Sequence, residues 1–315
     1  MYTLDKLDRK ILKILDWEGR LPVKHIAKRV KSNKDVVGYR IKQMEQEGII
    51  ARYFPVLDMF KLGYHTSRLY FDLEEMDEQQ EKKFLYYLDK EINAGLIFRM
   101  DYPYKWGIVF WVKWLYDIEK TIVKIKQYLG KKLVKYNHTL ISTFRQYPKD
   151  YCFETDHHTT SYSLEPKYAV EYDENDFKII RELAKNARVT TVNIAEKLKI
   201  PQTTVSSKIK SLEKKKIILG YRAEINFVKL GYTNYFLELY LDDNNNLKKI
   251  EQWANHNKNV VWLQKIVGTC DIEIEVEVKD RVALEGLLNE LRKTFKNIRK
   301  IIFWSQEYRK LTFLP

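Results

Sequence analysis

Basic and amide side chains recur on one face of a helical segment that the chain contains twice. The first copy is "DVVGYRIKQMEQEGII" (35–50) and the second is "TTVSSKIKSLEKKKII" (203–218). Arginine and lysine bond guanine edges and phosphate oxygens, and asparagine and glutamine can pair with adenine. These residue types at helical spacing therefore indicate nucleic-acid recognition. The candidate contacts on the two polar faces are Asn33, Lys34, Tyr39, Arg40, Lys42, Gln202, Thr203, Ser206, Ser207, Lys208 and Lys210.

Three short helices are needed to position each polar face. In the first copy, apolar residues recur at helical spacing in "LDRKILKILDW", "PVKHIAKRV" and "DVVGYRIKQMEQEG". Asp5 can cap the first helix, Pro22 suits the first turn of the second, and Ser32 starts a capping-box pattern before the third. This order predicts a helix-turn-helix (HTH) whose third helix enters the major groove. Arg52 and Arg222, just past "GII" and "KII", are expected where a wing would touch the DNA backbone.

The two HTH segments are copies of one longer unit. Asp8 corresponds to Asp176 without a gap, and "KLGY" occurs at both 61–64 and 229–232. A repeat this long indicates a duplicated domain rather than a solenoid. Most of the net charge of +13 lies in these copies, because residues 1–66 and 172–232 each carry +6. A basic balance concentrated in the HTH segments favours double-stranded DNA as the partner.

A β-rich stretch follows each HTH. In the second copy "TNYFLELYLD", "NVVWLQKIVG", "DIEIEVEVKD" and "IRKIIFWSQEYRKLTF" predict strands, with helices at "NLKKIEQWANH" and "VALEGLLNELRKTF". This order is βαββαβ, the ferredoxin-like arrangement, and the first copy repeats it more loosely. We therefore predict an α+β protein in which each winged-type HTH precedes a ferredoxin-like domain. The expected domains are 1–66, 67–147, a linker at 148–171, 172–232 and 233–315.

Composition limits the compartment and the chemistry. Two cysteines among 315 residues cannot form a disulfide framework, so a reducing cytoplasm is expected. The apolar stretch "WGIVFWVKWL" (106–115) is too short to span a membrane and is interrupted by Lys113. The sequence contains no phosphate-binding glycine loop, nucleophile elbow or HExxH pattern. No cofactor and no membrane partner are predicted.

The chain resembles the Lrp/AsnC transcription regulators. The resemblance rests on "LDRKILKIL", "GRLPVKHIAKRV", "YRIKQMEQEGIIARY" and "KLGY", and on their second copies. It implies a winged HTH joined to a RAM-type domain that binds effectors and forms oligomers. Family members usually carry one such unit and dimerise, so this chain resembles a dimer fused in tandem, with further homo-oligomers left open. The resemblance implies a regulator rather than an enzyme, with a small molecule such as an amino acid as its effector.

Two other interpretations remain open. Siroheme decarboxylases resemble the same architecture and use histidine near the junction of HTH and sheet, which would make this chain a tetrapyrrole enzyme. Only His65 lies near that junction here, and its counterpart is Thr233, so the regulator is favoured. A ligand sensor with vestigial HTHs is the third class. If both HTHs bind DNA, they should read different half-sites, because Tyr39-Arg40 in the first copy is replaced by Ser207-Lys208 in the second.

A glycine- and aspartate-containing turn is the candidate effector site. In the family this turn joins the second and third strands, and "GTCD" (268–271) resembles it, which implicates Gly268, Thr269 and Asp271. Glycine and aspartate also suit an ordinary hairpin turn. The next strand, "DIEIEVEV", places Glu273, Glu275 and Glu277 on one face.

This row of carboxylates could bind a cation, but a solvated face is the simpler expectation. In the first half Ile108, Phe110 and Val112 make the corresponding strand apolar on both faces, and the other half's sheet is the expected cover. His157, His158 and Cys152 lack two further ligands at metal-site spacing, so no metal is predicted.

Overall fold

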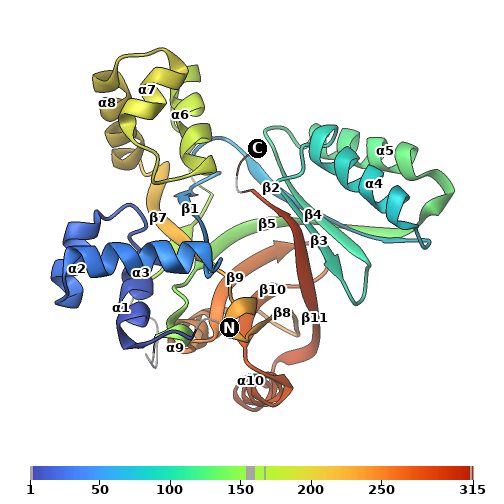
Figure 1. The fold of residues 1–315 in the computed structure, drawn as a ribbon. Coiled ribbons are helices and arrows are strands. Elements are labelled where there is room, and N and C mark those ends of the chain that lie inside the picture. The colour runs from blue at the N-terminus through green and yellow to red at the C-terminus, as the bar shows by residue number, and fades with distance from the viewer. Residues whose placement is uncertain (1–2, 154–159, 167, 313, 315) are drawn as a thin grey trace.

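The computed structural model describes residues 3–153, 160–166, 168–312 and 314 (Figure 1). Its elements form two HTH domains, a two-stranded ribbon between them, and one large β-barrel covered by helices. Every helix in the described residues is too short or too polar to cross a bilayer. His157 and His158 lie outside the described residues. Cys152 is buried, and with Tyr151 and Phe153 it joins the core of the first HTH.

The HTH domains form from helices with matching caps. The side chain of Asp5 accepts from the Asp8 backbone, and Asp8 reciprocates in a capping box, which confirms Asp5 as the cap. Asp173 and Asp176 form the same box in the second copy. The Ser32 cap was wrong, because Asn33 occupies the N-cap position and accepts from the Asp35 amide at 2.7 Å. The helices are α1 Lys6–Leu15, α2 Val23–Val30 and α3 Lys34–Gln46, then α6 Glu174–Lys185, α7 Thr191–Leu198 and α8 Gln202–Lys214.

The strand after each HTH pairs with its own duplicate. β1 (Ile50–Leu57) and β7 (Ile218–Ile225) form an antiparallel ribbon in which Phe54 lies opposite Arg222. Each HTH also contacts the other half: Arg188 donates to the backbone carbonyls of Gly19 and Leu21 at 2.8 and 3.1 Å. Because β1 follows the first HTH and β7 follows the second, their pairing holds the two HTH domains side by side (Figure 1).

Both βαββαβ units are present, and their sheets merge into a closed barrel. The pairing runs β2–β4–β3–β11–β8–β10–β9–β5 and returns to β2. Two seams join the halves, β3 with β11 and β5 with β9. Closure leaves these strands without free edges. The strands are β2 His65–Leu73, β3 Leu96–Met100, β4 Trp106–Val112, β5 Leu133–Gln146, β8 Thr233–Leu241, β9 Val260–Val267, β10 Ile272–Val278 and β11 Ile298–Leu311, with β6 Tyr162–Leu164 added to β5.

Helices cover the outside of the barrel, two from each half. They are α4 Glu78–Lys90 and α5 Tyr116–Leu129, then α9 Leu247–His256 and α10 Arg281–Thr294. Ile108, Phe110 and Val112 share a core with α4 and α5, so their expected cover by the other half was wrong. Side chains alternate along a strand, so the residues between them face inward. There Val109 and Trp111 pack near Phe236 and Trp304 of the second half. Short 3-10 turns occur at Gly130–Lys132, Asp150–Cys152 and Val228–Leu230.

Candidate nucleic-acid interface and barrel pocket

The third helix of each HTH presents a polar face to solvent. On α3, Lys34, Tyr39 and Lys42 are exposed, and Tyr39 is 64% accessible. Asn33 is exposed too, at the N-terminus of that helix. The faces differ in character, because α8 offers hydroxyl and amide groups where α3 has an aromatic ring. The exposed members of the α8 set are Gln202, Thr203, Ser207 and Lys210, with Ser206 half-buried.

Arg40 and Lys208 point toward their own domains. The guanidinium of Arg40 lies 3.0 Å from the Asp5 carboxylate and 3.6 Å from that of Asp8. At the matching position Lys208 pairs with Asp173 and, at 3.1 Å, with Asp176. Hydrogen bonds from the Asp8 backbone and the nearby Arg40 lower the pKa of Asp5. Both cations therefore bind the recognition helix to the first helix, and their contact with DNA stays a prediction.

The two arginines expected on a wing lie on the ribbon strands and bond to protein groups. Arg222 is buried; it pairs with the carboxylate of Asp16 and donates to the carbonyls of Asp16 and Tyr147 at 2.7 and 3.0 Å. Arg52 pairs with Glu224 on the opposite strand. Burial leaves Arg222 no surface for DNA, whereas Arg52 stays partly exposed and its contact with DNA stays a prediction.

The turn containing Gly268, Thr269 and Asp271 joins β9 to β10. Gly268 has a φ of 146°, and a β-carbon there would meet Thr139 at 3.1 Å, so glycine is required by the backbone. Asp271 accepts from the Leu241 amide at 2.7 Å. Five cavities in the described residues are lined by other segments. The geometry is that of a stabilised hairpin.

The row of glutamates on β10 is inside the barrel. Glu273, Glu275 and Glu277 are 1%, 6% and 2% exposed, so the expected solvated face was wrong. Sheet closure explains the difference, since the face that an open sheet would leave in water becomes the inner wall. Sequence alternation identified the shared face but carried no signal for closure.

Each buried glutamate has a different set of partners. Glu273 pairs with Arg68 and accepts from the Tyr70 hydroxyl at 3.0 Å. Glu277 pairs with Lys149 and accepts from the Tyr151 hydroxyl. Among the described residues, Glu275 accepts a single hydrogen bond, from the Asn234 amide at 2.7 Å. Burial raises the pKa of Glu275 to about 8, and the neighbouring carboxylate of Glu277 adds to that rise.

A second acidic group lies deeper in the barrel. Ligand atoms of Glu238, Cys270 and Glu273 lie within 4.8 Å of one another. Burial raises the pKa of Glu238 to about 7 and raises that of the Cys270 thiol as well. Because Arg68 and Tyr70 already bond Glu273 and Tyr240 bonds Glu238 at 2.7 Å, these groups are arranged as a hydrogen-bonded core network.

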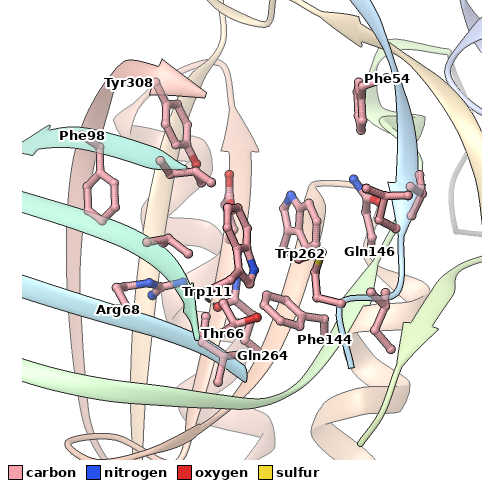
Figure 2. Close-up of a pocket in the computed structure, with 18 of the residues that line it drawn as sticks. Phe54, Thr66, Arg68, Phe98, Trp111, Phe144, Gln146, Trp262, Gln264 and Tyr308 are labelled. Atoms are coloured by element: carbon pink, nitrogen blue, oxygen red, sulfur yellow. Dashed lines mark hydrogen bonds between the residues drawn. The ribbon is translucent and has the colours of Figure 1, made fainter. Parts of the chain in front are cut away.

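A cavity occupies the barrel next to the ribbon (Figure 2). Its inner part measures about 90 Å³ and is bounded by aromatic rings, including Trp111, Phe98 and Phe144. A wider opening of about 400 Å³ shares Phe54, Trp262 and Glu275 with it. Sequence analysis missed this site, because its wall comes from both halves of the chain. Its polar members are Thr66, Arg68, Gln146, Gln264, Glu275, Gln306 and Tyr308.

Comparisons with known proteins identify the family. A model of winged helix-turn-helix DNA-binding domains matches residues 4–51 and 172–218. HTH-type transcriptional regulator LrpA of Bacillus subtilis is 30% identical over 122 residues, which are 38% of this chain and 90% of that protein. The chain belongs to the Lrp/AsnC family. An uncharacterised HTH-type transcriptional regulator of Pyrococcus abyssi is also 30% identical, over 41% of this chain and 85% of its own length.

These matches span one unit of the duplicated chain. Such a regulator is similar to about two-fifths of this Lrp/AsnC chain, as a tandem duplication requires. A solved structure similar to the whole chain is that of the siroheme decarboxylase NirDL, with a TM-score of 0.64 and coverage of 98% of this chain and 94% of that one. At 12% identity this similarity establishes a shared fold.

Proposed function

We propose that this Lrp/AsnC protein is a sequence-specific transcription regulator that binds double-stranded DNA as a covalent pseudo-dimer. The supporting observation is that both HTHs keep an exposed polar third helix while one ribbon joins them. An HTH dimer presents two recognition helices to neighbouring major grooves, and the fused chain supplies both. The +6 charge of each HTH segment supplies the attraction to phosphate.

The proposed base and phosphate contacts are the exposed members of the two helices. Tyr39 would give the first HTH more of the sequence preference, since Ser207 occupies the matching position on α8. Hydroxyl groups discriminate weakly between bases, so the second HTH would act more through phosphates. The remaining proposed contacts are Asn33, Lys34, Lys42, Gln202, Thr203, Ser206 and Lys210.

The tetrapyrrole-enzyme alternative fits the barrel less well. A tetrapyrrole bearing carboxylates needs cations to receive it, yet the inner wall contributes three buried glutamates from β10 alone. Arg68 and Lys149, which face these acids, are each already paired with one of them. Bringing more carboxylates beside desolvated carboxyl groups is unfavourable. We therefore favour a regulator without catalytic residues.

Salt-dependent DNA binding tests the proposal. Binding of the full chain to a genomic duplex pool should weaken as salt rises, with a log–log slope of about −0.9 for each phosphate contacted. Lys42→Ala and Lys210→Ala should each make the slope less steep by about one contact. Lys124→Ala, an exposed lysine on α5 outside the HTHs, is the matched control and should leave the slope unchanged. A slope near zero for the unmodified chain would exclude a DNA-binding function.

Sequences selected from a random duplex pool test the difference between the HTHs. We expect an asymmetric motif whose stronger half weakens in Tyr39→Ala, while Ser207→Ala changes the other half little. A symmetric palindrome that both variants leave intact would contradict the assignment.

A further inference from the structure

We propose that the barrel cavity binds a small organic amine, with its single-ring apolar body among the aromatic walls and its ammonium group at Glu275. This site is separate from the DNA-binding faces and does not rest on the proposed regulatory function. The ligand class follows from three features: buried hydrogen-bond acceptors that lack a partner, a carboxyl group that lacks a cation, and a wall of aromatic rings.

The first feature is a set of buried acceptors. The Thr66 hydroxyl and the Gln146 side-chain carbonyl have no hydrogen-bond partner within the described residues, although both residues line the cavity. Thr66 is 1% exposed and Gln146 is 5% exposed. Buried polar atoms are almost always bonded, so unsatisfied ones at a cavity indicate a missing partner. An ammonium group supplies three N–H donors, which suit these acceptors. Within the described residues the wall also contains two buried donors without a partner, Gln306 Nε2 and Arg68 Nε, which an ammonium group does not satisfy.

The second feature is that Glu275 lies among cationic side chains that already have acidic partners. Lys149, Arg222 and Arg309 line the wider opening, and their acidic partners are Glu277, Asp16 and Glu307. Deeper in the barrel, Arg68 is held by Glu273. In the described part of the chain Glu275 forms no ion pair, and it lines both the inner cavity and the opening. It is therefore placed where an entering cation would be paired.

The third feature is aromatic. Trp262 and Phe54 border both parts of the cavity, and Figure 2 shows Trp262 near its middle with Phe54 toward the ribbon. Aromatic faces attract cations, most strongly where water is excluded. The inner volume of about 90 Å³ limits the apolar body to roughly one ring, and the opening of about 400 Å³ gives an entry path.

Ligand binding would also contact the ribbon that joins the HTHs. Phe54 lies on β1 directly opposite Arg222 on β7, and both residues line the opening. A bound amine would thus touch the barrel and the ribbon together. An acidic ligand fits poorly, because its carboxylate would meet Glu275 instead of a free cation.

Calorimetric titration of the full chain without DNA tests the proposal. The probes are phenethylamine, its uncharged analogue 2-phenylethanol, and the anion 3-phenylpropionate. We expect saturable binding of one phenethylamine per chain, with the alcohol at least tenfold weaker and the anion weaker still. Because DNA is absent, this result is independent of whether the chain regulates transcription.

Two variants examine the assigned residues. Glu275→Gln should weaken phenethylamine at least tenfold and abolish the preference for amine over alcohol. Glu285→Gln, on the outer helix α10, is the matched control and should bind like the unmodified chain. Thr66→Val keeps the side-chain shape and should weaken the amine severalfold. It also provides the mutational test if Glu275→Gln fails to fold.

Equal binding of amine and alcohol by the unmodified chain would overturn the proposal. Absence of phenethylamine binding would do the same, as would unchanged affinity in a folded Glu275→Gln variant. If Glu275→Gln does not fold, unchanged amine affinity in Thr66→Val would contradict the assigned acceptor wall.

Discussion

The strands β4 and β10 hold the same place in the two copies and differ mainly on one face. Toward the helices both are apolar, with Ile108 and Phe110 on β4 and Ile274 and Val276 on β10. Toward the barrel interior, β10 carries its glutamates whereas β4 offers Val109 and Trp111. The helix-facing side forms the hydrophobic core of each unit, so its residues must stay apolar in both copies. The interior wall is shared, so one half could become polar while the other stayed apolar.

The ribbon shows the same division. Residues 54 and 222 are equivalent in the repeat and pair with each other, yet one is Phe and the other Arg. Phe54 faces the cavity, whereas Arg222 is bound to Asp16 beneath the first HTH. On the ribbon, the second half thus contributes a polar side chain that forms specific bonds, and the first half contributes an apolar side chain that lines the cavity.

The largest effect should come from breaking the polar side of the ribbon. Arg222→Ala leaves Asp16 buried without its cation, and removing one partner of a buried pair costs about 3–5 kcal/mol of the free energy of unfolding. Arg52→Ala breaks a more exposed pair on the same ribbon and should cost only about 1 kcal/mol. Urea unfolding measures both changes. Equal losses of stability would show that burial does not determine the cost of breaking these two ion pairs.

The inner wall should make stability depend on pH. The pKa of Glu275 rises from the ordinary 4.5 to about 8 in the folded chain, so the folded state holds a proton that the unfolded state releases. Its contribution is therefore complete below about pH 4.5 and is lost as pH rises through about 8. The charged or titratable neighbours are Glu277 on the same strand, Lys149, Arg68 and, from β11, Tyr308.

Glu275→Gln should remove this dependence while leaving the neighbours in place. At pH 7 it should unfold with a free energy about 3 kcal/mol higher than the unmodified chain, and at pH 5 the difference should fall to about 1 kcal/mol. Urea unfolding at the two pH values measures it. Val109→Ala on β4 should reduce stability equally at both. A pH-independent effect of Glu275→Gln would contradict a neutral buried carboxyl group.

The smallest effect concerns the turn after each recognition helix. Gly48 and Lys216 are equivalent and have φ values of 66° and 59°, in the left-handed region. Lys216→Gly should stabilise the second HTH by roughly 0.5 kcal/mol, whereas Gly48→Ala should destabilise the first by about 1 kcal/mol. Thermal unfolding measures both, and the same sign for the two changes would show that the turns are not equivalent.

The sequence predicted the parts that depend on local pattern. Helical periodicity identified both HTHs, and strand alternation identified both βαββαβ units. The sequence could not show that Arg40 lies beside Asp5. Helical periodicity indicates which residues share a face of one helix, but not which neighbouring helix that face meets. The sequence also did not show barrel closure, because closure depends on long-range pairing of β5 with β9 and of β11 with β3. The length of β5 and β11, 14 residues each, was the available signal.

Closure of the barrel by two unlike halves has an evolutionary consequence. In a symmetric homodimer every substitution on the inner wall occurs twice, so three buried glutamates would become six. Arg68, which neutralises one of them, has Phe236 as its counterpart, so two copies of the second unit would bring the acids without that cation. Once joined in one gene, each half could drift alone, and the second unit has thereby become dependent on the first.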